Sequence, residues 1–332
     1  MSGEAIAELR ARAEAGDRAA MTAYGKYLLV GDEEERPRVP EGASYIARAA
    51  ALDEPEALAQ QAVLTASGIA GAASWDAAFD QLQRAAELGS AAAQEQIRFL
   101  AGGDGDDFAA LRRAIDLDAW MRPRDFTLVR EAPRVLTVEG FMSKAECARM
   151  IARTLKLRRA DVYDPSSGVG MIAEERSNSK SEVTLANMDL PFLMVHARMS
   201  ATIGLPNRFF ELTNILHYSP GEQFTPHYDY LDPTEPGLRA DMETRGQRIV
   251  TFLVYLNEDY EGGETDFPRL GYRFKGKTGD ALMFGNVSAN GVPDQRTLHA
   301  GLPPTRGEKW LLSQWVRNRA ERAPLASRPP HH

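Results

Sequence analysis

Three residues of types that commonly bind metals, His227, Asp229 and His299, stand in an order that predicts an iron site. Two imidazoles and one carboxylate can hold a non-heme Fe(II) on one face and leave the opposite positions open for a co-substrate and oxygen. Lys309, ten residues after His299, adds a cation that can anchor an anionic co-substrate. Because an isolated H-x-D pair occurs often by chance, the prediction depends on the four residues together.

The elements that must position these residues are β-strands. In the second half of the chain, short β-rich runs separated by turn residues predict an antiparallel barrel or jelly roll. Side chains alternate along a strand, so His227 and Asp229 are expected to face the same way. If the chain reverses between residues 302 and 306, His299 and Lys309 lie opposite each other on an antiparallel pair. The clearest runs are LTNILHY, RIVTFLVYL, YRFKG, GDALMFGN, TLHAG and KWLLSQWVR.

Composition narrows the classes of partner. The chain has 332 residues, enough for about two domains, and a formal net charge of -8. An acidic chain does not neutralise phosphates, which argues against a nucleic-acid or anionic-membrane partner. The sequence shows neither a secretory leader pattern nor an apolar run long enough for a membrane helix. Cys147 is the only cysteine, which excludes an intrachain disulfide and fits a cytoplasmic, reducing location.

The first half of the chain is alanine-rich and contains an internal repeat. RAAALDEPEALAQQ from Arg48 and RAAELGSAAAQEQ from Arg84 superpose at a spacing of 36, and a weaker copy, RAEAGDRAAMTAY, precedes them. Asp53 and Gly89 fall at equivalent turn positions, and Gly16 matches them after a one-residue gap, as expected for stacked helical hairpins. The pattern, over roughly residues 5 to 102, resembles the tetratricopeptide-related, Sel-one-like repeats, which implies a protein-binding solenoid. An alanine-rich cap that packs on the neighbouring domain and binds nothing remains an equal alternative.

A linker composition marks the expected domain boundary. GGDGDD, at residues 102 to 107, combines permissive glycines with solvated carboxylates. We therefore expect a helical repeat domain at 1–105, a β-rich domain with flanking helices at 106–320, and a flexible tail at 321–332. Further helices are expected over FAALRRAIDLDAW, over CARMIARTL behind a capping box from Ser143 to Glu146, and over PFLMVHARMSATIG.

Five motifs stand in order over roughly residues 130 to 318: YSPGEQFTPHYD from Tyr218, RIVT through YLN from Arg248, GGETDFP from Gly262, GDA from Gly279, and HAG through KW from His299. Together they resemble the prolyl 4-hydroxylase branch of the 2-oxoglutarate (2OG) and Fe(II)-dependent dioxygenases. The resemblance implies a double-stranded β-helix, with Fe(II), 2OG and O2 as cofactor and co-substrates. The sequence leaves open whether ascorbate is needed to rescue oxidised iron.

The resemblance assigns roles to residues of this sequence. His227, Asp229 and His299 would bind iron, and Lys309 would bind the far carboxylate of 2OG. The hydroxyls of Thr265 and Tyr218 would assist Lys309. Because Asp229 stands where halogenating relatives have a small residue, the resemblance implies hydroxylation rather than halogenation.

The residues that would hold the substrate are less clear from the sequence. Alternation from Lys309 places Trp315 and Arg317 on the same strand face, and by resemblance Arg248 and Trp315 would position a peptide. Phe224 stands where many relatives have Tyr, and Arg317 where some have His. These departures put the peptide preference in doubt. Residues 164–180 and 231–246 are long enough to act as lids.

The predicted function is therefore hydroxylation of a proline in a protein or peptide substrate, which the N-terminal repeats would recruit. A free amino acid or small metabolite is the first alternative substrate. A non-catalytic helical-repeat scaffold or sensor is the second alternative, against which the intact set of His227, Asp229, His299 and Lys309 argues.

Overall fold

The computed structural model describes residues 2–32, 36–69, 71–163, 170–171 and 174–319. The expected tail at 321–332 and residues 164–169 and 172–173 of the first expected lid lie outside this part. The chain divides into two compact units. One, the helical unit, contains Met1–Pro123 and Thr184–Gly204, and the other, the β unit, contains Arg124–Val183 and Leu205–Arg322. The boundary expected at residue 105 falls inside the helical unit.

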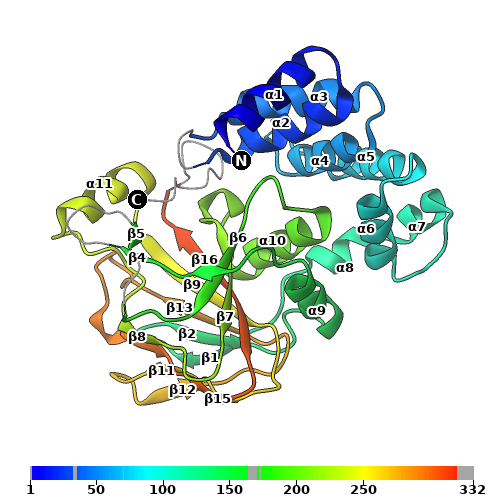
Figure 1. Cartoon of the computed structure of the whole chain (residues 1–332). Helices are drawn as coiled ribbons and strands as arrows, with labels where there is room; N and C mark the ends of the chain where they lie inside the picture. Colours follow the sequence, from blue (N-terminus) through cyan, green and yellow to red (C-terminus); the bar gives the residue numbers. More distant parts are fainter. Residues whose placement is uncertain (1, 33–35, 70, 164–169, 172–173, 320–332) are drawn as a thin grey trace. The chain divides into compact units, whose positions relative to one another are not determined.

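The helical unit begins with helices that pack in sequence order (Figure 1). Most of them start at a residue whose side chain accepts a hydrogen bond from the first turn, which satisfies a backbone N–H that the helix leaves free. The segment FAALRRAIDLDAW forms two short helices rather than one. The helices are α1 (Gly3–Glu14), α2 (Arg18–Val30), α3 (Val39–Ala50), α4 (Pro55–Ala66), α5 (Trp75–Glu87), α6 (Ala91–Ala101), α7 (Phe108–Ala114) and α8 (Leu117–Met121).

The turns between paired helices share one backbone feature. Asp53 and Gly89, which the repeat aligns, have positive φ, at 56° and 95°, and so does Gly16, aligned after a one-residue gap, at 98°. Such a φ reverses the chain in a short turn and favours glycine. The three turns are therefore equivalent, as the sequence predicts, whereas the assignment to a repeat family stays a prediction.

Helix α10 (Leu190–Ile203) belongs to the helical unit, although both of its ends lead into strands of the β unit. Buried polar side chains of α4 and α6 hold the segment. Gln60 donates to the carbonyl of Leu185 at 2.7 Å, and Gln96 accepts from the amide of Leu190 at 3.1 Å. The alanine-rich helices thus enclose a segment that is distant in sequence. No helix among the described residues is long and apolar enough to span a membrane.

The β unit contains two main antiparallel sheets (Figure 1). The eight-stranded sheet has the order β1-β2-β13-β9-β16-β7-β6-β3, and the four-stranded sheet has the order β12-β11-β14-β8. Two-stranded pairs, β10 with β15 and β4 with β5, complete the set. The bounds are β1 (Thr127–Arg130), β2 (Val135–Val138), β3 (Arg158–Arg159), β4 (Val162–Tyr163), β5 (Gly170–Met171), β6 (Ser179–Val183), β7 (Thr213–Tyr218), β8 (Phe224–His227), β9 (Arg248–Tyr255), β10 (Glu261–Gly262), β11 (Thr265–Phe267), β12 (Tyr272–Phe274), β13 (Ala281–Gly285), β14 (His299–Gly301), β15 (Pro304–Arg306) and β16 (Lys309–Arg317).

The core of the β unit lies between the two sheets. Its buried side chains come from both of them, for example Leu253, Phe284 and Leu311 from the larger sheet and Phe267 from the smaller. Helix α9 (Lys144–Ala152) begins with the expected capping box at Ser143, and α11 (Pro236–Arg245) lies in the second expected lid segment. Short 3-10 turns occupy Asn207–Phe209 and Gln295–Thr297. The chain is thus mixed, with a helical N-terminal region and antiparallel sheets.

Candidate active site

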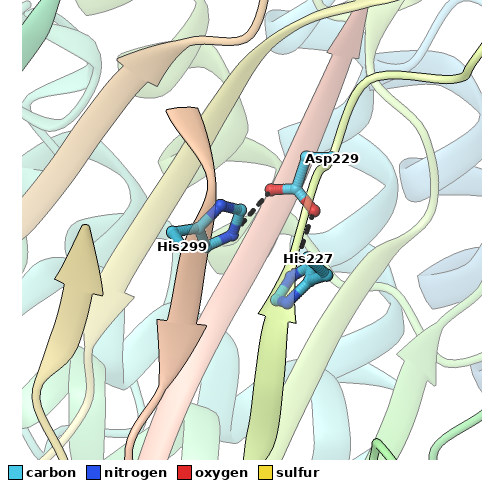
Figure 2. A group of neighbouring side chains, drawn as sticks. All are labelled: His227, Asp229 and His299. Atoms are coloured by element: carbon cyan, nitrogen blue, oxygen red, sulfur yellow. Dashed lines mark ion pairs between the residues drawn. The ribbon is translucent and has the colours of Figure 1, made fainter. Parts of the chain in front are cut away.

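The three expected metal ligands come together on the smaller sheet (Figure 2). One nitrogen or oxygen atom from each of His227, Asp229 and His299 lies within 4.8 Å of the others. The Nε2 atoms of His227 and His299 lie 3.7 and 3.4 Å from the Asp229 carboxylate oxygens. Two imidazoles and one carboxylate at this spacing match the ligand set of non-heme Fe(II).

Backbone carbonyls fix both imidazoles. His227 Nδ1 lies 2.8 Å from the carbonyl of Thr225, and His299 Nδ1 lies 3.0 Å from the carbonyl of Thr297. Because a carbonyl can only accept, Nδ1 carries the proton and the Nε2 lone pair is left for a metal. Burial lowers the pKa of His227 to about 3, so the ring is neutral at neutral pH.

The carboxylate of Asp229 is oriented by a short hydrogen-bond chain. Thr251 Oγ1 donates to Asp229 Oδ2 at 2.7 Å, and Asn286 Nδ2 donates to Thr251 Oγ1 at 3.0 Å. All three residues are buried. A carboxylate held in this way keeps its remaining lone pairs directed toward the histidines.

Strand pairing brings the ligands together in a way that differs from the expectation. His299 on β14 pairs with His227 on β8, whereas Lys309 on β16 pairs with Tyr218 on β7, in the other sheet. The expected pairing of His299 with Lys309 is therefore wrong. β8 ends at His227, so Asp229 is aimed by the bend that follows rather than by strand alternation.

Lys309 closes an inner cavity that begins at the triad. The cavity has about 420 Å³ of empty space, including its mouth, and Tyr218 and Thr265 also line it. Lys309 is fully buried, and no hydrogen-bond partner among the described residues reaches its Nζ. Burial lowers its pKa to about 7, because a desolvated ammonium is unfavourable without an anion. A carboxylate at this end would satisfy Nζ, so the residues present fit 2OG.

Two tyrosine rings lie near that lysine. Its Nζ is 5.0 Å from the ring centre of Tyr218 and 5.6 Å from that of Tyr255. The Tyr255 hydroxyl is 2.8 Å from Thr265 Oγ1 and also donates to the carbonyl of Phe274 at 3.1 Å. Burial raises the pKa of Tyr218 to about 12, so this phenol stays protonated and can donate to an anion.

An outer cleft meets the inner cavity at the triad. It has about 1040 Å³ of empty space, including its mouth, and its walls include Tyr228, Tyr230 and Leu238. His227 and Asp229 line both spaces. A metal held by the triad would therefore face an anion pocket on one side and an open cleft on the other.

Comparisons with known proteins agree with this arrangement. The family model for the 2OG-Fe(II) oxygenase superfamily matches residues 213–317. "Probable prolyl 4-hydroxylase 6" of Arabidopsis thaliana is 33% identical over 218 residues, which cover 60% of this chain and 74% of that protein. The chain belongs to the prolyl 4-hydroxylase-like 2OG-Fe(II) oxygenases. "Probable prolyl 4-hydroxylase 7" of the same plant is 34% identical over 213 residues, which cover 58% of this oxygenase and 66% of that relative.

Among solved structures, this oxygenase is similar to the viral collagen prolyl hydroxylase from Paramecium Bursaria Chlorella virus-1, solved as a 2OG complex. The two are 28% identical with a TM-score of 0.41. The match covers 55% of this oxygenase and 95% of the viral chain.

Three of the four expected substrate residues line the outer cleft of this oxygenase. Phe224 stacks on His227 with ring centres 3.4 Å apart, and Arg248 lies 3.7 Å from the ring centre of Trp315. Glu211 holds the guanidinium of Arg248 through two hydrogen bonds of 2.6 and 2.9 Å. Arg248 is thus fixed as part of the wall, with its charge already paired.

Arg317 departs from the expectation and lines neither space. Its guanidinium donates to Glu211 at 2.5 Å and to Asp241 of α11 at 2.8 Å. The cause is local, because the register of β16 against β9 shifts between Val316 and Arg317. Such a bulge ends the alternation that carries Lys309 and Trp315 to the cavity.

The sequence reasoning did not identify Thr251, Tyr255 and Arg176. Strand alternation in RIVTFLVYL could have found Thr251 and Tyr255, which share a face with Leu253 of the inner cavity. Arg176 lies in a segment without a clear pattern, and its buried guanidinium stacks over Phe224 at 4.5 Å. It lines both spaces, and no local signal in the sequence predicts that placement.

Thr251→Val is expected to weaken Fe(II) binding about 10- to 100-fold, because Asp229 loses its orienting donor. The unpaired Asn286 amide should also lower the free energy of unfolding by about 1 to 3 kcal/mol. Anaerobic Fe(II) titration and denaturant unfolding measure the two effects. Thr251→Ser keeps the hydroxyl and is expected to behave like the wild type. Equal losses in both variants would show that packing, not the hydrogen bond, matters.

Proposed function

We propose that this oxygenase hydroxylates a prolyl residue of a peptide or protein, consuming 2OG and O2 and releasing succinate and CO2. The observation that carries the proposal is the meeting of two spaces at His227 and Asp229. Bound iron would supply the oxidising chemistry, and the chain's own residues would position the reactants. Lys309, Tyr218 and Thr265 would hold 2OG in the inner cavity.

The extent of the outer cleft supports a peptide rather than a single amino acid. Its lining includes Asp161, Lys180 and Leu238, so it extends beyond the metal ligands to three other segments of the chain. Phe224 and Trp315 stand where the cleft reaches the metal ligands and can hold one C–H bond of the substrate near the iron.

We further propose that the two main sheets form a double-stranded β-helix and that ascorbate keeps the iron reduced. The core between the sheets and the siting of the ligands on the smaller sheet support the fold. Recruitment of a protein substrate by the helical unit stays a prediction. The intact triad and Lys309 argue against a non-catalytic scaffold.

The test is to incubate the full chain with Fe(II) and 2OG and to compare proline-containing peptides with free proline. We expect succinate to form in equal amount with a mass gain of one oxygen atom on a peptide proline. Omission of 2OG is the matched control. Oxidation of free proline but of no peptide would instead support a small-molecule hydroxylase, and failure to turn over 2OG with every candidate would support a scaffold.

A further inference from the structure

The segment after the metal ligand builds one wall of the outer cleft from two tyrosines. Tyr228 and Tyr230 flank Asp229, line the cleft, and stack on each other with ring centres 4.7 Å apart and planes inclined by 27°. Both rings are half-buried. The guanidinium of Arg269 lies 5.8 Å from the centre of the Tyr228 ring and also donates to the carbonyl of Gln295 at 3.0 Å. The stack is therefore supported by the turn between β11 and β12.

Directly after this stack, the chain forms a long loop with α11, residues 231 to 247. The side chain of Gln247 joins the two ends of this loop by hydrogen bonds. Gln247 Oε1 accepts from the amides of Leu231 and Arg248 at 2.7 and 2.8 Å. Its Nε2 donates to the carbonyl of Leu231 at 2.7 Å and to Met242 Sδ at 3.1 Å. An amide side chain has two donors and two acceptor lone pairs, so the bonding capacity of Gln247 is fully used. These hydrogen bonds fix the backbone at Leu231, next to Tyr230.

The C-terminal end of this loop is also held by Asn318, after β16. The amide of Gln247 donates to Asn318 Oδ1, and the amide of Asn318 donates to the carbonyl of Gln247, both at 3.0 Å. Gly246 has φ +78°, and a Cβ there would come within 2.2 Å of Asn318 Oδ1. Only glycine fits this approach. Both ends of the loop that contains α11 are therefore held by hydrogen bonds.

We propose that the Tyr228–Tyr230 stack binds the residue next to the reacting proline, selecting a ring there, and that Gln247 positions the stack. The inference rests on the proposed function and specifies the substrate. Aromatic faces stack on aromatic rings and on the apolar ring of proline, whereas alanine offers too little surface for such stacking. Trp315 lines the same cleft, and its buried indole N–H has no hydrogen-bond partner in the described part of the chain, so a peptide carbonyl can accept it. Because Tyr228 and Tyr230 are adjacent to Asp229 in the sequence, the stack lies next to the metal site.

Peptides that differ only beside the target proline test the selection. The wild type is expected to hydroxylate a peptide with proline or phenylalanine there about tenfold more efficiently than one with alanine, and Tyr230→Leu should abolish this ratio. Tyr230→Phe keeps the ring and should keep the ratio. A ratio near one in the wild type, or an unchanged ratio in Tyr230→Leu, overturns the inference alone. Hydroxylation of none of the peptides overturns the proposed function and the inference with it.

A coupled pair of substitutions tests the positioning role of Gln247. Gln247→Leu is expected to raise the KM for the ring-containing peptide about tenfold while the KM for 2OG stays within about twofold. If Gln247 acts through the stack, Gln247→Leu should add less than about twofold in the Tyr230→Leu background. Equal effects in both backgrounds, or a parallel rise of the KM for 2OG, would show a general structural role and overturn the proposal for Gln247.

Discussion

His227→Ala is expected to lose Fe(II) binding and, with it, all measurable 2OG turnover. The substitution removes one of three ligands, and loss of an outer partner alone costs roughly 10- to 100-fold in metal affinity. Loss of a direct ligand should cost more. The remaining pair, Asp229 and His299, can hold a divalent ion only weakly. Anaerobic Fe(II) titration measures the affinity, and succinate release measures the turnover.

The matched control is a histidine on the preceding strand, which belongs to the larger sheet. His217 of β7 binds Glu308 through Nε2 at 3.0 Å and lines neither the inner cavity nor the outer cleft. His217→Ala is therefore expected to bind iron normally and to keep turnover within about twofold of the wild type. Tight one-to-one Fe(II) binding by His227→Ala would remove His227 from the metal centre. Equal loss in both variants would indicate misfolding.

Local patterns in the sequence are enough to predict much of this site. Alternation along β16 places Lys309, Leu311, Ser313 and Trp315 in the inner cavity, as a period of two requires. Alternation alone does not say which strand is the partner, because pairing is decided by packing across the whole sheet. That is why Lys309 was expected opposite His299 and is found opposite Tyr218.

Deviations from regular strands set the limit of the prediction. The bulge before Arg317 cannot be read from KWLLSQWVR, and it turns this arginine from the cavity to Glu211. Strand β6, with the sequence SKSEV, has too few apolar residues to show an alternating pattern. It nevertheless pairs with β7 along its full length. Tertiary pairing overrides weak local preference in such segments.

In the helical unit, too, the sequence predicts an element but not its packing partners. The sequence predicts the helix α10 but not where it packs, and ten of its positions are buried. Composition cannot say which unit buries it. The contacts of Gln60 and Gln96 with the start of this segment place it among the alanine-rich helices. A cut at residue 105 would therefore remove packing partners of α10, so truncation would test folding as well as recruitment.

Lys309→Met is expected to raise the KM for 2OG about 10- to 150-fold while Fe(II) binding is preserved. A hydrogen bond between an ammonium and a carboxylate contributes about 1.5 to 3 kcal/mol, and about 1.4 kcal/mol corresponds to a factor of ten. Methionine is unbranched and of similar length, so the site stays filled. The two effects are separated by measuring succinate release against 2OG concentration and by titrating Fe(II) without 2OG.

The pH dependence gives a second signature of Lys309. Burial lowers the pKa of Lys309 to about 7, against roughly 10.4 for an unfolded lysine. Between these values the folded chain binds fewer protons than the unfolded chain, so stability without 2OG should rise with pH and then level off. Binding the 2OG carboxylate requires the protonated lysine. The KM for 2OG should therefore rise about tenfold per pH unit above pH 7 in the wild type, and Lys309→Met should lack this slope.

Lys275 provides a control that distinguishes the effect of the buried Lys309 ammonium from the effect of any nearby positive charge. Lys275 is exposed, donates to the carbonyl of Tyr260 at 2.6 Å, and disfavours the charged form of Lys309 through repulsion. Lys275→Met should keep the KM for 2OG within about twofold of the wild type and keep its rise above pH 7. If Lys309→Met retains the wild-type KM and its pH slope, Lys309 is not the anchor of 2OG. If both lysine variants lose the slope equally, the effect is long-range electrostatics, and the buried ammonium has no special part in binding the co-substrate.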